Sequence, residues 1–256
     1  MYFAHTSEDG RRQPIMDHLA GTAALAEKFA GAFGAGEFGR CCGMLHDAGK
    51  FSEAFQRRLL KDGPKVDHST AGAQAALKAS RTGIGLIAAY CVAGHHAGLP
   101  DGGGSADTPA EATLFARMRR AVPDFSSFYR DVDPRVLVPK SRPPIRMTGK
   151  RGFSASFFIR MLFSCLVDAD FLDTEAFEHN RPVRGGIGES IPALCAKLER
   201  YVGRFRNPSG DLNRRRCEIL ETCLRKSAGP RGLYTLTVPT GGGKTFAMRR
   251  NAGWSG

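Results

Sequence analysis

Five histidines and three aspartates are distributed over five short motifs that lie far apart along the chain. In chain order these residues are His18, His46, Asp47, His68, His95, His96, Asp168 and Asp170. Imidazole and carboxylate groups can hold two divalent ions side by side, and paired ions are used to cleave phosphate esters. The pattern constrains the fold because these segments must converge on one place. It predicts a metal-dependent phosphohydrolase or nuclease.

The histidine doublet is the part of this pattern that is hardest to explain without a metal. A dipeptide such as His46-Asp47 arises readily by chance, and by default it caps a helix or packs in a core. His95 and His96 instead follow the small apolar residues 92–94, where two ring dipoles would lie unsatisfied at the end of a buried helix. Since adjacent residues on a helix end point about 100° apart, the imidazole of His46 can bind one ion while Asp47 bridges two.

The length and the cysteine content indicate a reduced protein with one large domain. The 256 residues suit one domain of about 200 residues with an appendage. The seven cysteines show no C-x-x-C spacing, so we expect free thiols. The N-terminus lacks the layout of a signal peptide, and no run reaches roughly 18 apolar residues. We therefore expect a cytoplasmic protein with no membrane partner.

An excess of positive charge favours a polyanionic partner such as nucleic acid. The formal net charge is +12 and the isoelectric point is near 9.7. Between Arg135 and Arg151 the chain has six basic residues, three prolines and no acidic residue. Because the prolines prevent a long helix, we expect an exposed, mobile loop. This basic segment either touches a phosphate backbone or is a solvated surface loop.

Apolar residues recur at helical spacing through most of the chain. The spacing predicts helices near residues 15–33, 37–49, 51–59, 69–80, 84–92, 111–121, 153–171, 189–205 and 211–226. The helix at 153–171 is the most apolar and should be central. The period changes only at residues 233–238, which read as a short buried strand. We expect an all-α domain over residues 1–205, followed at 206–256 by a linker and the start of an incomplete α/β domain.

The same motifs, in this order, resemble the HD superfamily, and more closely the HD nuclease domain of the CRISPR-associated nuclease-helicase of type I systems, the Cas-three family. The resemblance covers roughly residues 4–175. The matching motifs are His18-Leu19, Leu45-His46-Asp47-Ala48-Gly49-Lys50, Asp67-His68-Ser69-Thr70-Ala71-Gly72, Gly94-His95-His96-Ala97-Gly98-Leu99-Pro100 and Asp168-Ala169-Asp170-Phe171.

The resemblance implies a ligand for each position of a two-ion centre. One ion would be held by His18, His46, Asp47 and Asp170, and a second by Asp47, His68, His95 and His96, with Asp47 bridging. Asp170 is preferred to Asp168 because the carboxylate of the family precedes an aromatic residue, here Phe171. The other aspartate would orient a histidine or lie near the helix end. Lys50 would lie beside the ions, where its ammonium can contact a substrate phosphate, although a helix-terminal lysine is usually solvated.

The implied activity is hydrolysis of single-stranded DNA by a water that two metal ions activate. A histidine-rich site without thiolates suits Mn, Fe, Co or Ni better than Mg. The resemblance also implies a role in type I CRISPR interference. The partners would be a guide-RNA surveillance complex that exposes the DNA strand and a helicase domain in cis or in trans.

A glycine-rich run near the C-terminus resembles the start of the family's helicase core. It has the superfamily-2 helicase form Pro239-Thr240-Gly241-Gly242-Gly243-Lys244-Thr245, and it follows the expected strand. The backbone amides at Gly241 and Gly243 would cradle phosphates, with Lys244 on the terminal phosphate and Thr245 on Mg²⁺. Only eleven residues follow Thr245, so we expect an incomplete RecA-like domain. ATP and Mg²⁺ would be cofactors only if a full helicase were present.

Two other functions remain open from the residues alone. The first is an HD phosphohydrolase that acts on nucleotides or cyclic nucleotides and would need a closed, nucleoside-reading pocket. The second is a catalytically impaired fragment that binds DNA or the surveillance complex without turnover.

Overall fold

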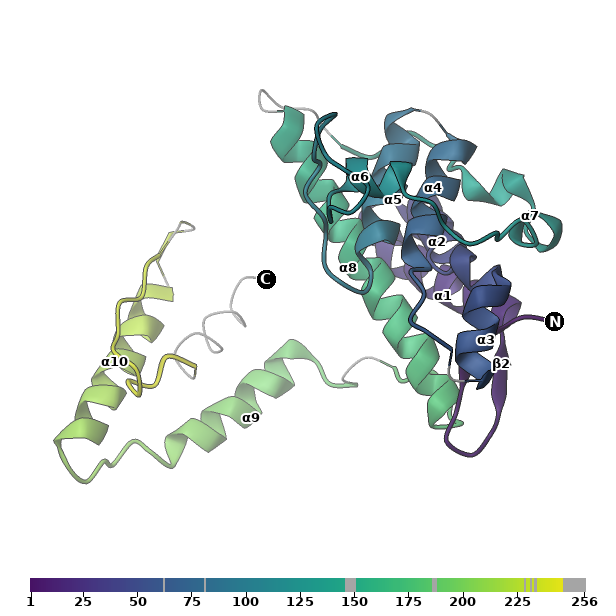
Figure 1. The fold of residues 1–256 in the computed structure, drawn as a ribbon. Coiled ribbons are helices and arrows are strands. Elements are labelled where there is room, and N and C mark those ends of the chain that lie inside the picture. The colour runs from purple at the N-terminus through teal and green to yellow at the C-terminus, as the bar shows by residue number, and fades with distance from the viewer. Residues whose placement is uncertain are drawn as a thin grey trace. The chain divides into compact units, whose positions relative to one another are not determined.

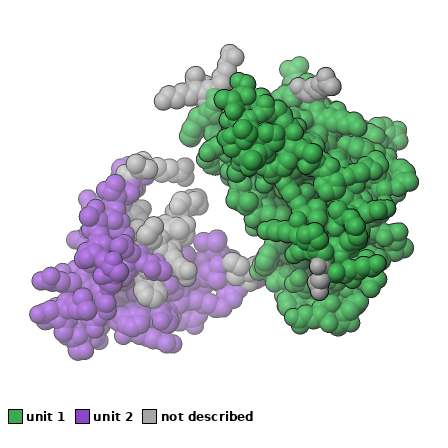
Figure 2. All heavy atoms as spheres, viewed as in Figure 1, with its two compact units in different colours: residues 1–184 green, residues 185–256 purple. Residues whose placement is uncertain are grey.

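The computed structural model describes residues 1–61, 63–80, 82–145, 151–185, 188–227, 229–230, 232 and 234–245. The chain divides into two compact units, Met1–Arg184 and Gly185–Gly256, which are coloured separately in Figure 2. The predicted boundary after residue 205 therefore falls inside the second unit.

The first unit is built almost entirely from helices, which confirms the predicted all-α class (Figure 1). Its elements are β1 (Phe3–Thr6), β2 (Arg12–Pro14), α1 (Ile15–Gly31), α2 (Gly36–Leu45), the 3₁₀ turn η1 (Ala48–Phe51), α3 (Glu53–Lys61), α4 (Ser69–Ala79), α5 (Gly83–Gly94), α6 (Leu114–Arg119), α7 (Phe128–Asp131), the 3₁₀ turn η2 (Pro134–Leu137) and α8 (Arg151–Glu178). Every helix expected in this unit is present, although α6 is shorter than predicted and α8 is longer. The sequence predicted neither the β1–β2 hairpin nor α7 and η2.

Helices α1 and α2 form a tight antiparallel pair. Their short connection turns at Gly34, whose φ of +76° is strained for residues with a Cβ. Two glycines of α2, Gly39 and Gly43, lie directly against the backbone of α1. A Cβ built on Gly43 would lie 2.5 Å from the Cα of Ala23. The helices approach this closely because the facing residues are small, and the packing fixes the end of α2 that precedes His46.

Helix α8 is the central helix, as its apolar composition predicts. It packs against α1, α2 and α5 and buries Phe158, Leu162, Leu166 and Ala169 in the core. The ring of Phe158 meets that of Phe38 edge to face, with centroids 5.6 Å apart. This packing carries the C-terminal half of α8, including Asp170, alongside α1.

The β1–β2 hairpin lies next to η1 and α3. Its strands pair antiparallel, with His5 opposite Gln13. The amide of Gln56 in α3 accepts a hydrogen bond from the Phe3 N–H at 3.0 Å and donates to the carbonyls of Phe3 and Lys50 at 2.9 and 2.8 Å. The hairpin is thereby held against the segment that carries Lys50.

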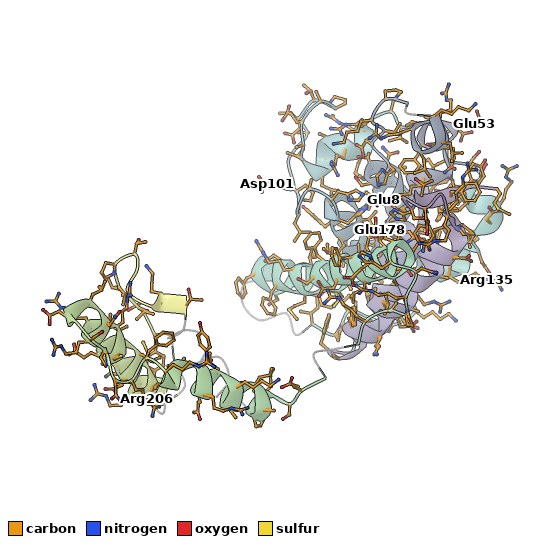
Figure 3. All side chains as sticks on the ribbon, turned by 90° about the horizontal axis from the view of Figure 1, so that it is seen from below. Glu8, Glu53, Asp101, Arg135, Glu178 and Arg206 are labelled. Atoms are coloured by element: carbon orange, nitrogen blue, oxygen red, sulfur yellow. The ribbon has the colours of Figure 1, made fainter. Side chains whose placement is uncertain are left out.

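The basic segment of residues 135–151 begins in η2 and continues without regular structure to residue 145. Arg135, Lys140 and Arg142 are exposed, as expected, and Figure 3 labels Arg135. One carboxylate oxygen of Glu37 accepts hydrogen bonds from the backbone N–H groups of Lys140 and Ser141 at 3.0 and 2.8 Å, which ties this part of the segment to α2. Arg146 and Lys150 lie outside the described residues.

The second unit contains two helices, α9 (Ile191–Gly203) and α10 (Asp211–Ser227), among its described residues. Both were expected. The predicted strand is wrong for residues 234–238, which are described and have no strand conformation. Most of these residues are exposed, because no neighbouring strand pairs with them in the described part of the unit. A strand pattern becomes a stable strand only when a sheet surrounds it.

None of the helices in the described part of the chain combines the length and the apolar character that a membrane span requires.

Replacing Gly43 by alanine should destabilise the protein by about 1–3 kcal/mol, because the new Cβ collides with the backbone of α1. Urea unfolding followed by circular dichroism measures this change. Gly31→Ala is the matched control, because a Cβ there meets nothing within 4 Å. The control should be neutral or stabilising by up to about 1 kcal/mol. Equal stability of the two variants would contradict the close packing of α1 on α2.

Candidate metal centre

The predicted ligands converge in the first unit, and most of them lie at helix ends. His18 lies in α1 and Asp170 in α8. His46 and Asp47 follow α2, His68 immediately precedes α4, and the doublet His95-His96 follows α5. Five segments that are distant in the sequence therefore contribute to one cluster.

Asp47 is at the centre of this cluster, and its two oxygens face different imidazoles. Oδ2 lies 3.2 Å from Nε2 of His18 and 3.4 Å from Nε2 of His46. Oδ1 lies 3.3 Å from Nε2 of His68 and 3.6 Å from Nε2 of His95. We call His18, His46 and Asp170 the first ligand group, and His68, His95 and His96 the second ligand group. Asp47 joins the two groups.

The geometry selects Asp170 over Asp168. One oxygen of Asp170 lies 3.4 Å from Nε2 of His18 and 3.5 Å from Nε2 of His46. Asp168 is exposed, since it lies on the opposite face of α8. Asp170 is therefore placed in the first ligand group.

The Nδ1 atoms of three histidines are anchored, which leaves their Nε2 atoms to face the centre. Nδ1 of His46 donates to the carbonyl of Gly43, and Nδ1 of His95 donates to that of Val92, both at 2.7 Å. Nδ1 of His18 lies 2.8 Å from a carboxylate oxygen of Asp173. Such partners fix the ring and the tautomer of a metal-binding histidine.

Several buried polar atoms at this centre have no hydrogen-bond partner among the described residues. They include Oδ1 of Asp47 and Nε2 of His95, which lie 3.6 Å apart, too far for a hydrogen bond. The Nε2 atoms of His18 and His46 lie 3.1 Å apart, and those of His68 and His96 lie 2.7 Å apart. Because acceptors face the Nδ1 atoms of His18 and His46, these atoms carry the ring protons, and neutral rings would place lone pair against lone pair in the first of these contacts. A cation between them satisfies these atoms, and the buried histidine and aspartate groups could therefore hold metal.

Electrostatics distinguish the two ligand groups. Burial opposes the charged forms of His18 and His46, but Asp170 and Asp47 outweigh it and raise the pKa of His18 to about 9 and that of His46 to about 10. In the second ligand group burial dominates and lowers the pKa values of His68 and His96 to about 4. Without a metal, protons balance the carboxylates of the first ligand group at neutral pH, while these two rings of the second stay uncharged.

Lys50 lies beside Asp47 as expected, but its ammonium faces the interior. Nζ is 2.6 Å from Oδ2 of Asp47 and 3.2 Å from both the carbonyl of Ala4 and Nε2 of His5. These three partners account for the three N–H donors of the ammonium, and the residue is only 4% exposed. Burial alone would raise the pKa of Asp47, but the charges of Lys50 and His46 outweigh it and keep that pKa well below its usual range.

The sequence analysis missed Asp173 and gave no role to His5. Asp173 follows Asp170 by three residues on α8, and this spacing on one helix face is the signal that could have found it. One of its oxygens also accepts a hydrogen bond from the amide of Gln13 at 2.8 Å. His5 approaches the ring of His18 edge to face at 4.7 Å, and burial lowers its pKa to about 3.

The predicted nucleotide-binding residues lie in the second unit. Gly241 and Gly243 both have a φ of +84°, and a helical turn begins at Lys244 and Thr245. Nζ of Lys244 donates to the carbonyl of Val238 at 2.9 Å. The residues after Thr245 lie outside the described part of the chain, so nucleotide binding stays a prediction.

Comparison of the chain with protein-family models and with curated proteins gave no match.

Gly21→Ala should weaken metal binding at the first ligand group by about 10–100-fold, because loss of the group that orients a metal-binding histidine has an effect of this size. The added Cβ would lie 1.9 Å from Oδ1 of Asp173 and so push this carboxylate away from His18. A competitive Mn²⁺ titration measures the change, with Gly31→Ala as the control in the same helix. Unchanged affinity in Gly21→Ala would show that Asp173 does not orient His18.

The metal-free protein should be most stable near pH 6.5. The raised pKa values of His18 and His46 give stability that is complete below the ordinary value of 6.5 and is lost as the pH rises through about 9 and 10. The lowered pKa values remove stability as the pH falls from 6.5 towards about 4 for His68 and His96 and towards about 3 for His5. Urea unfolding of chelator-treated protein across this range tests the maximum. Stability that rises from pH 6.5 to 9 would contradict these assignments.

Proposed function

We propose that the first unit is a metal-dependent phosphodiesterase that cleaves single-stranded DNA and belongs to the HD nucleases of the Cas-three family. The observation that carries this proposal is the placement of Asp47, whose two oxygens face separate imidazole groups. A carboxylate in this position can bridge two ions, which is the arrangement of two-metal phosphoesterases.

The chain would hold the two ions through the two ligand groups. His18, His46, Asp47 and Asp170 would hold one ion, and Asp47, His68, His95 and His96 the other. Bound divalent ions would supply an activated water and neutralise charge on the phosphate. The mixture of imidazole and carboxylate ligands, with no thiolate among them, favours Mn, Fe, Co or Ni.

The other residues of the centre prepare these ligands. The anchors on Nδ1 of His18, His46 and His95 keep each Nε2 aimed at the centre before substrate arrives. Lys50 supports the ionised form of Asp47. Because its donors are already used, we assign Lys50 to balancing charge on Asp47 rather than to holding substrate.

The exposure of the ligands indicates the side from which substrate arrives. His18, His46, Asp47 and His95 are buried, whereas the side chains of His68 and Asp170 are 14% and 18% exposed and His96 is exposed. The centre therefore opens to the surface along the residues His68, His96 and Asp170. An open rim suits a phosphodiester within a polymer, and the net charge of +12 favours a polyanion.

The proposal extends to the biological role of the chain and to its second unit. The chain would act in type I CRISPR interference on a strand that a guide-RNA surveillance complex exposes. The segment Gly241–Thr245 would belong to the start of a superfamily-2 helicase domain, and a complete helicase would act in cis or in trans.

Asp47→Asn should abolish tight metal binding and reduce cleavage of single-stranded DNA by more than about a hundredfold, because the amide keeps the shape of the side chain but loses its charge. The assay measures cleavage of a labelled single-stranded oligonucleotide by Mn²⁺-loaded protein, together with metal content. Asp168→Asn is the matched control, since it removes an exposed aspartate near the centre and should leave both readouts unchanged.

Two outcomes would contradict the proposal. One is wild-type protein that takes up no divalent ion, and the other is cleavage that survives in Asp47→Asn. Faster hydrolysis of free or cyclic nucleotides than of the oligonucleotide would instead support a nucleotide phosphohydrolase.

A further inference from the structure

The short helix α6 lies against both elements that carry the second ligand group. It contacts α4, which begins directly after His68, and α5, which ends directly before His95. None of the proposed ligands belongs to α6. The side chains of Arg117, in α6, and of Arg120, which directly follows the helix, nevertheless point to the chain segments next to these histidines.

Arg117 connects the two segments directly. Its Nη1 donates to the carbonyl of Ala93, two residues before His95. The same nitrogen lies 3.4 Å from the hydroxyl of Ser69, the residue after His68. One guanidinium therefore sets the spacing between the segments that carry His68 and His95.

Arg120 fixes the other side of His68. Its Nη1 donates to a carboxylate oxygen of Asp67 at 3.0 Å. Asp67 in turn accepts hydrogen bonds from the backbone N–H of Thr70 at 3.1 Å and from the hydroxyl of Ser69 at 3.2 Å. The residues before and after His68 are thereby joined to each other and to α6.

The ring of His68 needs this support because its Nδ1 has no anchor. Its Nδ1 is buried and has no hydrogen-bond partner among the residues that the structure describes. His18, His46 and His95 differ, since their Nδ1 atoms are held by Asp173 or by backbone carbonyls. Besides the contacts of its ring with Phe55 and His96, the direction of Nε2 in His68 therefore depends on the position of its backbone.

We infer that Arg117 is a positioning residue for the second ligand group. It holds His68 and His95 at the spacing that one metal ion requires. The inference rests on the proposed two-ion centre. Arg117 should affect the second ligand group alone, because Asp173 and Gly43 support the first ligand group separately. Loss of Arg117 should weaken the binding of one ion and leave the binding of the other unchanged.

The test counts the Mn²⁺ ions that the full chain binds, using the electron paramagnetic resonance signal of free Mn²⁺ during a titration. Wild-type protein should bind two ions. Arg117→Gln should bind one ion as tightly as wild type and the other about 10–100-fold more weakly, which is the usual effect of losing a residue that positions metal ligands. Arg119→Gln is the matched control, because Arg119 is exposed in the same helix and lies over the ring of Phe115. It should bind both ions as wild type does.

The outcomes separate this inference from the proposed function. Wild-type protein that binds fewer than two ions contradicts the two-ion centre itself. Two ions in wild type with unchanged affinities in Arg117→Gln overturn the role of Arg117 alone. If circular dichroism shows that Arg117→Gln is unfolded, Arg117→Lys decides, since it keeps the charge but has no planar fork. Weaker binding of one ion alone supports the inference. Equal weakening of the binding of both ions, or no change, overturns it.

Discussion

The rest of the centre depends on one buried carboxylate. Asp47 is 1% exposed and ionised, and an unpaired charge in such a place is strongly unfavourable. Imidazoles on both sides of the carboxylate and the ammonium of Lys50 compensate this charge. Lys50 is itself satisfied by Ala4 and His5 in the hairpin. The charge of Asp47 therefore connects β1 with the ends of α2 and α5.

Placing ligands at helix ends solves a geometric problem. The residue that directly follows each of α2 and α5 lies about one helical turn beyond a backbone carbonyl. The ring of His46 can therefore donate a hydrogen bond to the carbonyl of Gly43, and the ring of His95 to that of Val92. No second side chain is needed to orient these two rings. His18 lies inside α1, where the carbonyls are already used, and it depends on Asp173 of another helix. A Cβ on Gly21 would occupy the space of that carboxylate.

The sequence predicted which histidines and aspartates lie together, but not most of the residues that support them. The histidine motifs and Asp47 could be recognised because their chemistry is unusual at any position, and long helices such as α8 follow from periodicity. The partners of Lys50 depend on which segments lie side by side, and local patterns do not contain this information. The hairpin has strands too short to show a period of two residues. The strand expected at 233–238 is absent at 234–238 for the opposite reason: the pattern is clear, but there is no sheet to join among the described residues.

Helix α8 also determines when this centre can form during synthesis. Nearly half of the chain separates Asp170 from Asp47, and both carboxylates face the same imidazoles. A ribosome adds about 5–20 residues per second, so the residues up to Asp47 exist for on the order of ten seconds before Asp170 is made. Until then α1 and α2 lack the helix that covers them. Assembly of the complete histidine and aspartate cluster must therefore follow translation of α8, and a nascent chain that stalls earlier would expose the apolar faces of both helices.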